Sequence, residues 1–164
     1  MKKPGVHTII DNLPKVLAGI EVLTTTQVMV GVPDSNAGRE DGPISNASLA
    51  YIHDNGAPEV NIPKREFLAP GVKNVQGRIN EWFRKIGDYA LAGRPEAVEK
   101  GLYAIGLITQ SSIKAKIRSG PFTPLKDSTL EARRRRGVKR TKPLIDTTQL
   151  LNSINFVIRK IRRK

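Results

Sequence analysis

Two segments with strand character lie near opposite ends of the chain, and this placement most strongly constrains the fold. Residues 26–33 and 155–159 are rich in β-branched and aromatic side chains, as half-buried strands usually are. Between them, residues 71–91 and 95–118 carry apolar residues at intervals of three and four, the pattern of a helix with one buried face. This order predicts an α+β protein. Its small mixed or antiparallel sheet, formed by the N- and C-terminal strands, packs with the two long central helices and irregular basic loops.

Two shorter helices are predicted in the first third of the chain. Residues 6–23 have helical apolar spacing, and Pro14 inside them is expected to end or kink the helix because proline lacks an N–H and clashes with the preceding turn. Residues 45–52 form a second candidate, with Ser45 as its N-cap and Gly56 as its C-terminal stop.

The remaining segments are predicted to be less regular. Residues 34–44 combine acidic residues with glycine and proline, which is typical of a mobile loop. Three prolines make residues 58–70 extended, with room for short edge strands. Residues 119–146 form a basic, mostly extended segment with a short helix near 128–136, and another short helix is expected over 147–153.

The positive charge is concentrated in the last third of the chain. The 164 residues suit a single domain over 1–164, and their formal net charge is +13. Residues 1–112 hold 12 basic and 12 acidic side chains, whereas residues 113–164 hold 16 basic and 3 acidic ones. Such asymmetry points to a polyanionic partner. No apolar run approaches the roughly 18 residues of a membrane span, so a membrane is not among the expected partners.

The densest cations are the candidate contact surface for a partner or for DNA. They comprise seven side chains within ten residues and three at the chain end: Arg133, Arg134, Arg135, Arg136, Lys139, Arg140 and Lys142, with Arg162, Arg163 and Lys164. Lys and Arg neutralise phosphates without reading sequence, and such binding depends steeply on salt. The runs lack the interleaved aromatic residues that stack on bases, so base-specific reading is not expected. The alternative is a solvated face or flexible arm.

The sequence offers few residues for catalysis. It has no cysteine and two histidines, and it lacks both the phosphate-binding glycine loops and the GxSxG pattern. His53 and Asp54 are a conceivable base and orienting group, but neighbouring residues on a helix do not face each other. We therefore expect no enzyme, no cofactor and no metal, with a small nuclease or hydrolase using His53 and Asp54 as a competing hypothesis.

An ordered set of segments carries a further pattern: residues 49–58 (LAYIHDNGAP), 62–70 (IPKREFLAP), 124–130 (PLKDSTL) and 143–154 (PLIDTTQLLNSI). Together they resemble the A-x-I-H-E-x-G, I-P-x-R-x-F-L-x-P, P-L-x-x-x-T-L and K-P-L-I-D-T-G-x-L-x-x-S-I stretches of small neck and tail-completion proteins of tailed bacteriophages, in the virion-morphogenesis and minor-tail families. Asp54 stands where that pattern has Glu, and Thr148 where it has Gly, the residue that a turn with positive φ favours.

The resemblance implies a non-enzymatic virion protein, made in the host cytoplasm and assembled as a homo-oligomeric ring in the neck, at the head–tail interface. Family members join the portal, a head-completion protein or an adaptor to the tail terminator or tail tube protein around the DNA passage. Non-specific contact with the packaged double-stranded DNA is left open, as are the ring's copy number and the choice between head and tail completion. The competing class is a basic nucleic-acid-binding protein of ribosomal or chromosomal type.

A proline-fixed segment is a candidate for docking because it is ordered at low entropic cost. Its residues are Pro63, Arg65, Phe67 and Leu68. The alternative is that Phe67 and Leu68 belong to the core of their own domain, as single apolar residues usually do.

Overall fold

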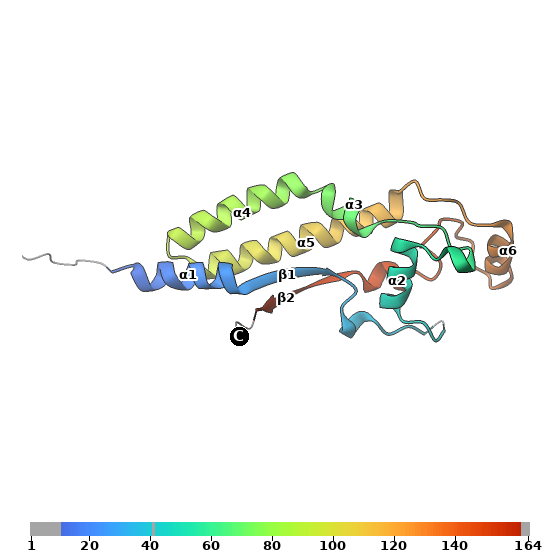
Figure 1. Cartoon of the computed structure of the whole chain (residues 1–164), viewed down its shortest axis with the longest axis horizontal. Coiled ribbons are helices and arrows are strands. Elements are labelled where there is room, and N and C mark those ends of the chain that lie inside the picture. The colour runs from blue at the N-terminus through green and yellow to red at the C-terminus, as the bar shows by residue number, and fades with distance from the viewer. Residues whose placement is uncertain (1–10, 41, 162–164) are drawn as a thin grey trace, which may run out of the picture.

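The two terminal strands pair, as the sequence predicts. The structure is a computed structural model that describes residues 11–40 and 42–161, and Figure 1 shows an elongated molecule with both strands beneath the central helices. Strands β1 (Thr26–Gly31) and β2 (Asn155–Lys160) form a two-stranded antiparallel sheet in which Val28 lies opposite Ile158. The α+β class is confirmed, and the sheet is antiparallel rather than mixed.

Helices account for most of the described chain. They are α1 (Leu13–Thr25), α2 (Asn46–Asn55), α3 (Leu68–Lys73), α4 (Gln76–Leu91), α5 (Pro95–Ser119), α6 (Asp127–Arg135) and α7 (Gln149–Ser153), with one-turn 3-10 helices at Asp34–Asn36 and Pro58–Val60. The predicted helices near 95–118, 128–136 and 147–153 are thus found within a few residues of their expected ends.

Helices α4 and α5 pack together and run along the long axis of the molecule (Figure 1). Gly93 turns the chain between them at φ +66°, a conformation that glycine adopts without steric cost. Pro95 follows in the first turn of α5, where its missing N–H removes no helical hydrogen bond. Helix α1 packs on both helices, and the sheet packs on α5.

The core has two centres along this axis. One lies where α1, α4 and α5 meet, around Ile86 and Val98, and the other joins the second half of α5 to α3 and α7, around Phe67 and Ile113. The helices approach closely at the first centre: α5 carries glycine at position 101, where a Cβ would stand only 2.4 Å from the Ile86 side chain. The second centre carries the end of the molecule where α2 and α6 lie (Figure 1).

Two predicted helices differ from those in the structure: one begins later than expected, and the other is divided into two. Pro14 does not break the first helix but lies in the first turn of α1, and residues 6–10 of the predicted helix lie outside the described residues. The helix predicted over 71–91 is two helices, α3 and α4. The backbone carbonyl of Gly71 accepts a hydrogen bond from the Ser112 hydroxyl at 2.6 Å, while Val75 N–H bonds to Val72, which tightens the last turn of α3.

The irregular segments are held by specific hydrogen bonds. Residues 58–70 contain no strand in the described structure; they hold a 3-10 turn closed by an isolated bridge between Ala57 and Ile62. In the 34–44 loop, the buried Asn46 side chain donates to the carbonyl of Gly38 at 2.6 Å, which ties the loop to the start of α2. Residue 41 lies outside the described residues.

Candidate functional site

The segments that carry the phage resemblance meet at one end of the molecule. Helix α2 begins as predicted, with the Ser45 side chain accepting a hydrogen bond from Ser48 N–H, and it ends at Gly56 at φ +82°. This helix places Asp54 so that one carboxylate oxygen accepts from the backbone N–H groups of Phe67 and Leu68, at 2.8 and 3.0 Å. Asp54 therefore satisfies backbone donors at the start of α3 and joins the first segment to the second.

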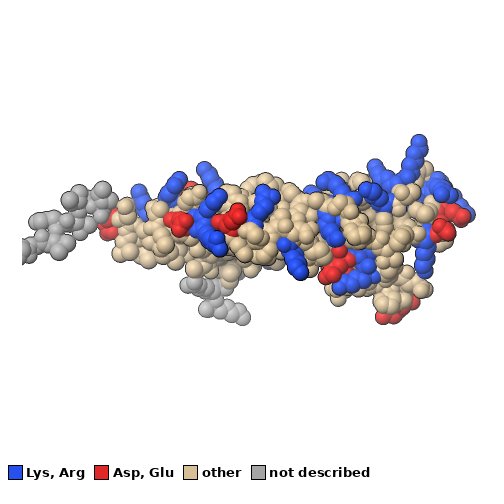
Figure 2. Space-filling view, turned by 90° about the horizontal axis from the view of Figure 1, so that it is seen from above, with Lys and Arg blue, Asp and Glu red and all other residues tan. Residues whose placement is uncertain are grey.

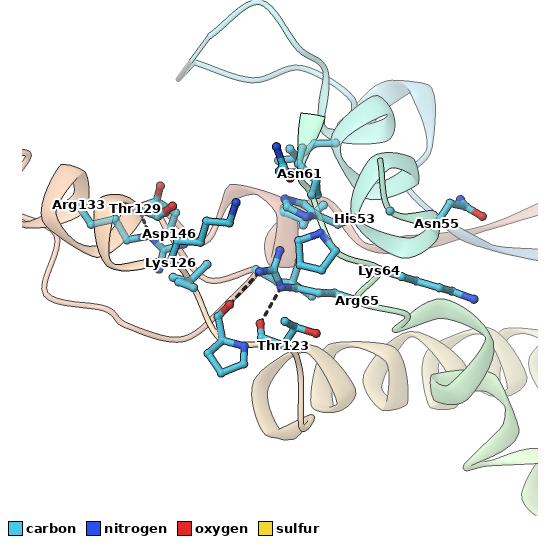
Figure 3. Close-up of a pocket in the computed structure, with 18 of the residues that line it drawn as sticks. His53, Asn55, Asn61, Lys64, Arg65, Thr123, Lys126, Thr129, Arg133 and Asp146 are labelled. Carbon is cyan, nitrogen blue, oxygen red and sulfur yellow. Dashed lines mark hydrogen bonds and ion pairs between the residues drawn. The ribbon is translucent and has the colours of Figure 1, made fainter. Parts of the chain in front are cut away.

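Arg65 joins the second segment to the third. Its guanidinium donates to the backbone carbonyls of Thr123 at 3.0 Å and Pro124 at 3.3 Å (Figure 3). The side chain is almost entirely buried and has no acidic partner among the described residues. Arg65 was a candidate docking residue, but in this structure it holds residues 123–124 against its own domain.

Arg133 holds together the loop that follows α6. It is only 5% exposed, and its Nη1 lies 3.0, 2.9 and 3.4 Å from the backbone carbonyls of Arg140, Lys142 and Ile145. Its Nε lies 3.6 Å from the Asp146 carboxylate, which also pairs with Arg136 at 2.8 Å. Arg133 is therefore mostly buried and occupied with intrachain contacts, unlike the exposed cation of the predicted contact surface.

The other predicted contact cations divide into three groups. Arg136, Arg140 and Lys142 each make an intrachain bond, to the Asp146 side chain, the Asp146 carbonyl and the Arg118 carbonyl. Arg134, Arg135 and Lys139 are exposed, and no hydrogen bond or ion pair joins their side chains to a described residue. Figure 2 shows Lys and Arg gathered at this end of the molecule. Arg162, Arg163 and Lys164 lie outside the described residues.

Phe67 and Leu68 do not form an exposed docking element. Phe67 has 0% exposure and lies at the centre of the second core cluster, while Leu68 is half-buried against the same cluster. The intrachain alternative therefore describes both residues in this structure. Pro63 is half-buried and lines the cleft described next.

A cleft of about 780 Å³ lies among the 3-10 turn at 58–60, α2, α6 and the start of α7 (Figure 3). Basic side chains line it from several parts of the chain: Arg39, His53, Lys64, Arg65, Lys126 and Arg133. Among the described residues that line it, Asp146 is the single acidic one. The sequence did not predict this cleft, because Arg39, Lys64 and Lys126 belong to separate segments of the chain and only the fold brings them together.

His53 is half-buried in the wall of this cleft beside Arg65 (Figure 3). Burial, followed by the positive charges of Arg65, Arg39 and Arg133, lowers the pKa of His53 from 6.5 to about 4. Its Nδ1 is buried and has no hydrogen-bond partner among the described residues. The Asp54 carboxylate binds backbone N–H groups instead of orienting the His53 ring. The pair is therefore not arranged as the base and orienting group that the hydrolase hypothesis requires.

Thr148 adopts the backbone conformation that the resemblance expects of a glycine. Its φ is +67°, in the left-handed region, immediately before α7. The bond from Asn152 N–H to the Thr148 carbonyl then starts the helix. The left-handed turn is thus present although Thr148 is β-branched, at a conformational cost of about 1–2 kcal/mol.

Comparison with known protein families, with characterised proteins and with solved structures finds no match to this chain. No helix in the described ranges 11–40 and 42–161 is long and apolar enough to cross a membrane. The same ranges hold no group of three or more histidine and acidic side chains arranged to bind a metal ion.

Proposed function

We propose that this protein is a structural component of a bacteriophage neck, where copies assemble as a ring that joins the portal or an adaptor to the tail terminator or tube. The observation that carries the proposal is the ordered set of resembling segments and the way in which they are connected. Asp54 bonds the first segment to the second, and Arg65 bonds the second to the third. Residues spread over about seventy positions, from Asp54 to Pro124, thus serve a single structural unit.

Exposed apolar side chains provide surface that suits contacts between copies of the chain. Leu13, Leu17 and Ile20 are exposed on α1 at a spacing of four and three, which places them on one face of the helix. Tyr103 and Ile158 are also exposed, near the sheet. Contacts with neighbouring copies would remove such surface from water. Repeated contacts between unlike surfaces form a ring when the rotation from copy to copy closes.

The exposed cations suit a position next to DNA or to an acidic neighbour. Arg134, Arg135 and Lys139 remain exposed after the intrachain bonds are made, so their charge is available to a partner. The same observation favours the second candidate, a basic nucleic-acid-binding protein. That candidate predicts DNA or RNA binding that weakens steeply between about 50 and 200 mM salt.

Removal of the gene tests the proposal. The gene is deleted from the genome that encodes it, and the particles that the host releases are imaged by negative stain, with a plasmid-borne copy as the control. The proposal predicts filled heads and free tails that fail to join, and joined particles when the plasmid copy is present. Normal infectious particles without the gene would refute the neck function and favour the nucleic-acid-binding candidate.

A further inference from the structure

The cleft at the α2–α6 end combines positive charge with an apolar lining. Five Lys and Arg side chains line it, and Asp146, the single acidic residue among the described lining, is already engaged by Arg136 and lies beside Arg133. Its apolar lining includes residues that precede α6 in the sequence and residues that follow it: Leu49, Ile62, Pro63, Leu125, Leu144 and Leu150. A ligand that fits this surface carries negative charge together with apolar groups.

Two buried groups of the cleft wall have binding capacity that the chain does not use. Arg65 bonds to two carbonyls but has no acidic partner among the described residues, so its charge is not neutralised there. His53 presents a buried Nδ1 with no hydrogen-bond partner in the described structure. A buried polar atom without a partner costs free energy, and a guanidinium charge that no acid neutralises attracts an anion.

The shape and lining of the cleft favour a peptide over a nucleic acid. A duplex is too wide to enter a pocket of about 780 Å³. Single strands are held chiefly by stacking of bases on aromatic rings, and Phe, Tyr and Trp are absent from the described lining. A free phosphate would leave the apolar lining in contact with water. An extended peptide, by contrast, presents alternating side chains to a groove.

We propose that this cleft is a docking site for a segment of a partner protein in which an Asp or Glu is flanked by apolar residues. The carboxylate lies toward Arg39, Lys126 and the His53 edge, and the flanking side chains cover the leucine and proline lining. The inference rests on the proposed function for the claim that the partner is a virion protein. The chemistry of the cleft can be tested without particles, so the two proposals can fail separately.

Selection from a random twelve-residue peptide library on the immobilised full-length chain tests the inference. The variant Arg39→Glu/Lys126→Glu serves for counter-selection, because both side chains line the cleft and neither makes an intrachain bond in the described structure. The matched control, Arg78→Glu/Arg84→Glu, reverses two exposed charges on α4, away from the cleft. Near-UV circular dichroism checks that each variant keeps the native fold.

The expected result is enrichment of peptides with Asp or Glu beside apolar residues. Anisotropy titrations should show binding at least about tenfold weaker to Arg39→Glu/Lys126→Glu, within about twofold for the control, and weaker at higher salt. An NMR shift of the His53 ring on peptide addition should place the peptide in the cleft. Three results would each overturn the inference: no enrichment, equal binding to the cleft variant, or displacement of every peptide by a twelve-nucleotide oligo-dT that itself shifts His53.

Discussion

The four consecutive arginines of α6 provide a matched pair for testing the intrachain role of one of them. Arg133 and Arg134 are neighbours on the same helix, but Arg133 is buried against three backbone carbonyls and Arg134 is exposed. Replacing either by Ala removes one positive charge and leaves a strong helix former. The two variants therefore differ mainly in the bonds that only Arg133 makes.

The size of the difference follows from the geometry. Nη1 carries two hydrogens, so it can satisfy two of its three acceptors well at one time, and the 3.4 Å contact to Ile145 is the weakest. Bonds from a charged donor contribute about 1.5–3 kcal/mol each, offset partly by the cost of burying the guanidinium. We expect Arg133→Ala to lower the free energy of unfolding by about 3 kcal/mol.

Urea unfolding at 25 °C, followed by circular dichroism, measures both variants against the parent. Arg134→Ala should lie within about 0.5 kcal/mol of the parent, as exposed substitutions usually do. The melting temperature of Arg133→Ala should fall by about 6–12 °C, given about 2–4 °C per kcal/mol for a chain of this size. Equal stability of the two variants would refute the assignment of Arg133 to the loop after α6.

Three further predictions follow from the structure. Gly106→Ala should lower the free energy of unfolding by about 1–3 kcal/mol, since its Cβ would stand 2.3 Å from the Phe156 ring. Gly87→Ala, on α4, has open space around the new Cβ and should raise the free energy of unfolding by up to about 1 kcal/mol. NMR titration should find the His53 pKa near 4. Because the unfolded chain then binds more protons between pH 6.5 and 4, stability should fall as pH falls through that window, and His53→Asn should remove that part of the slope. Thr148→Gly should raise the unfolding free energy by about 0.5–1 kcal/mol, because relief of the strained φ of +67° outweighs the greater conformational entropy of glycine in the unfolded chain. A lower unfolding free energy would contradict this.

Local sequence patterns predicted the regular elements because their causes are local. The spacing of apolar residues in α5 and the β-branched run in β1 are properties of neighbouring positions, and both elements appear where expected. The prediction for Pro14 is wrong because proline breaks a helix interior but suits the first turn, and apolar spacing alone does not fix where a helix begins. Close to the break between α3 and α4, the Gly71 carbonyl accepts from Ser112, which is 41 residues away in the sequence, so a local pattern does not reveal this contact.

The candidate site was only partly predictable, for a similar reason. A run of arginines reveals charge but not which of them is buried, and Arg133 differs from Arg134 only in the direction that its helix gives it. The cleft depends on Arg39, Lys64 and Lys126, which belong to three separate segments. Contacts between distant segments, such as Arg65 with Thr123, decide the site.

Cryo-electron microscopy of particles produced from the genome that encodes this chain tests the proposed neck function most directly. The proposal predicts density at the head–tail junction that repeats around the tail axis and fits the elongated α4–α5 pair with the sheet beneath α5. Mass spectrometry of the same particles should detect the chain in several copies per particle. Infectious particles that lack the protein, or that hold it away from the junction, would contradict the proposal.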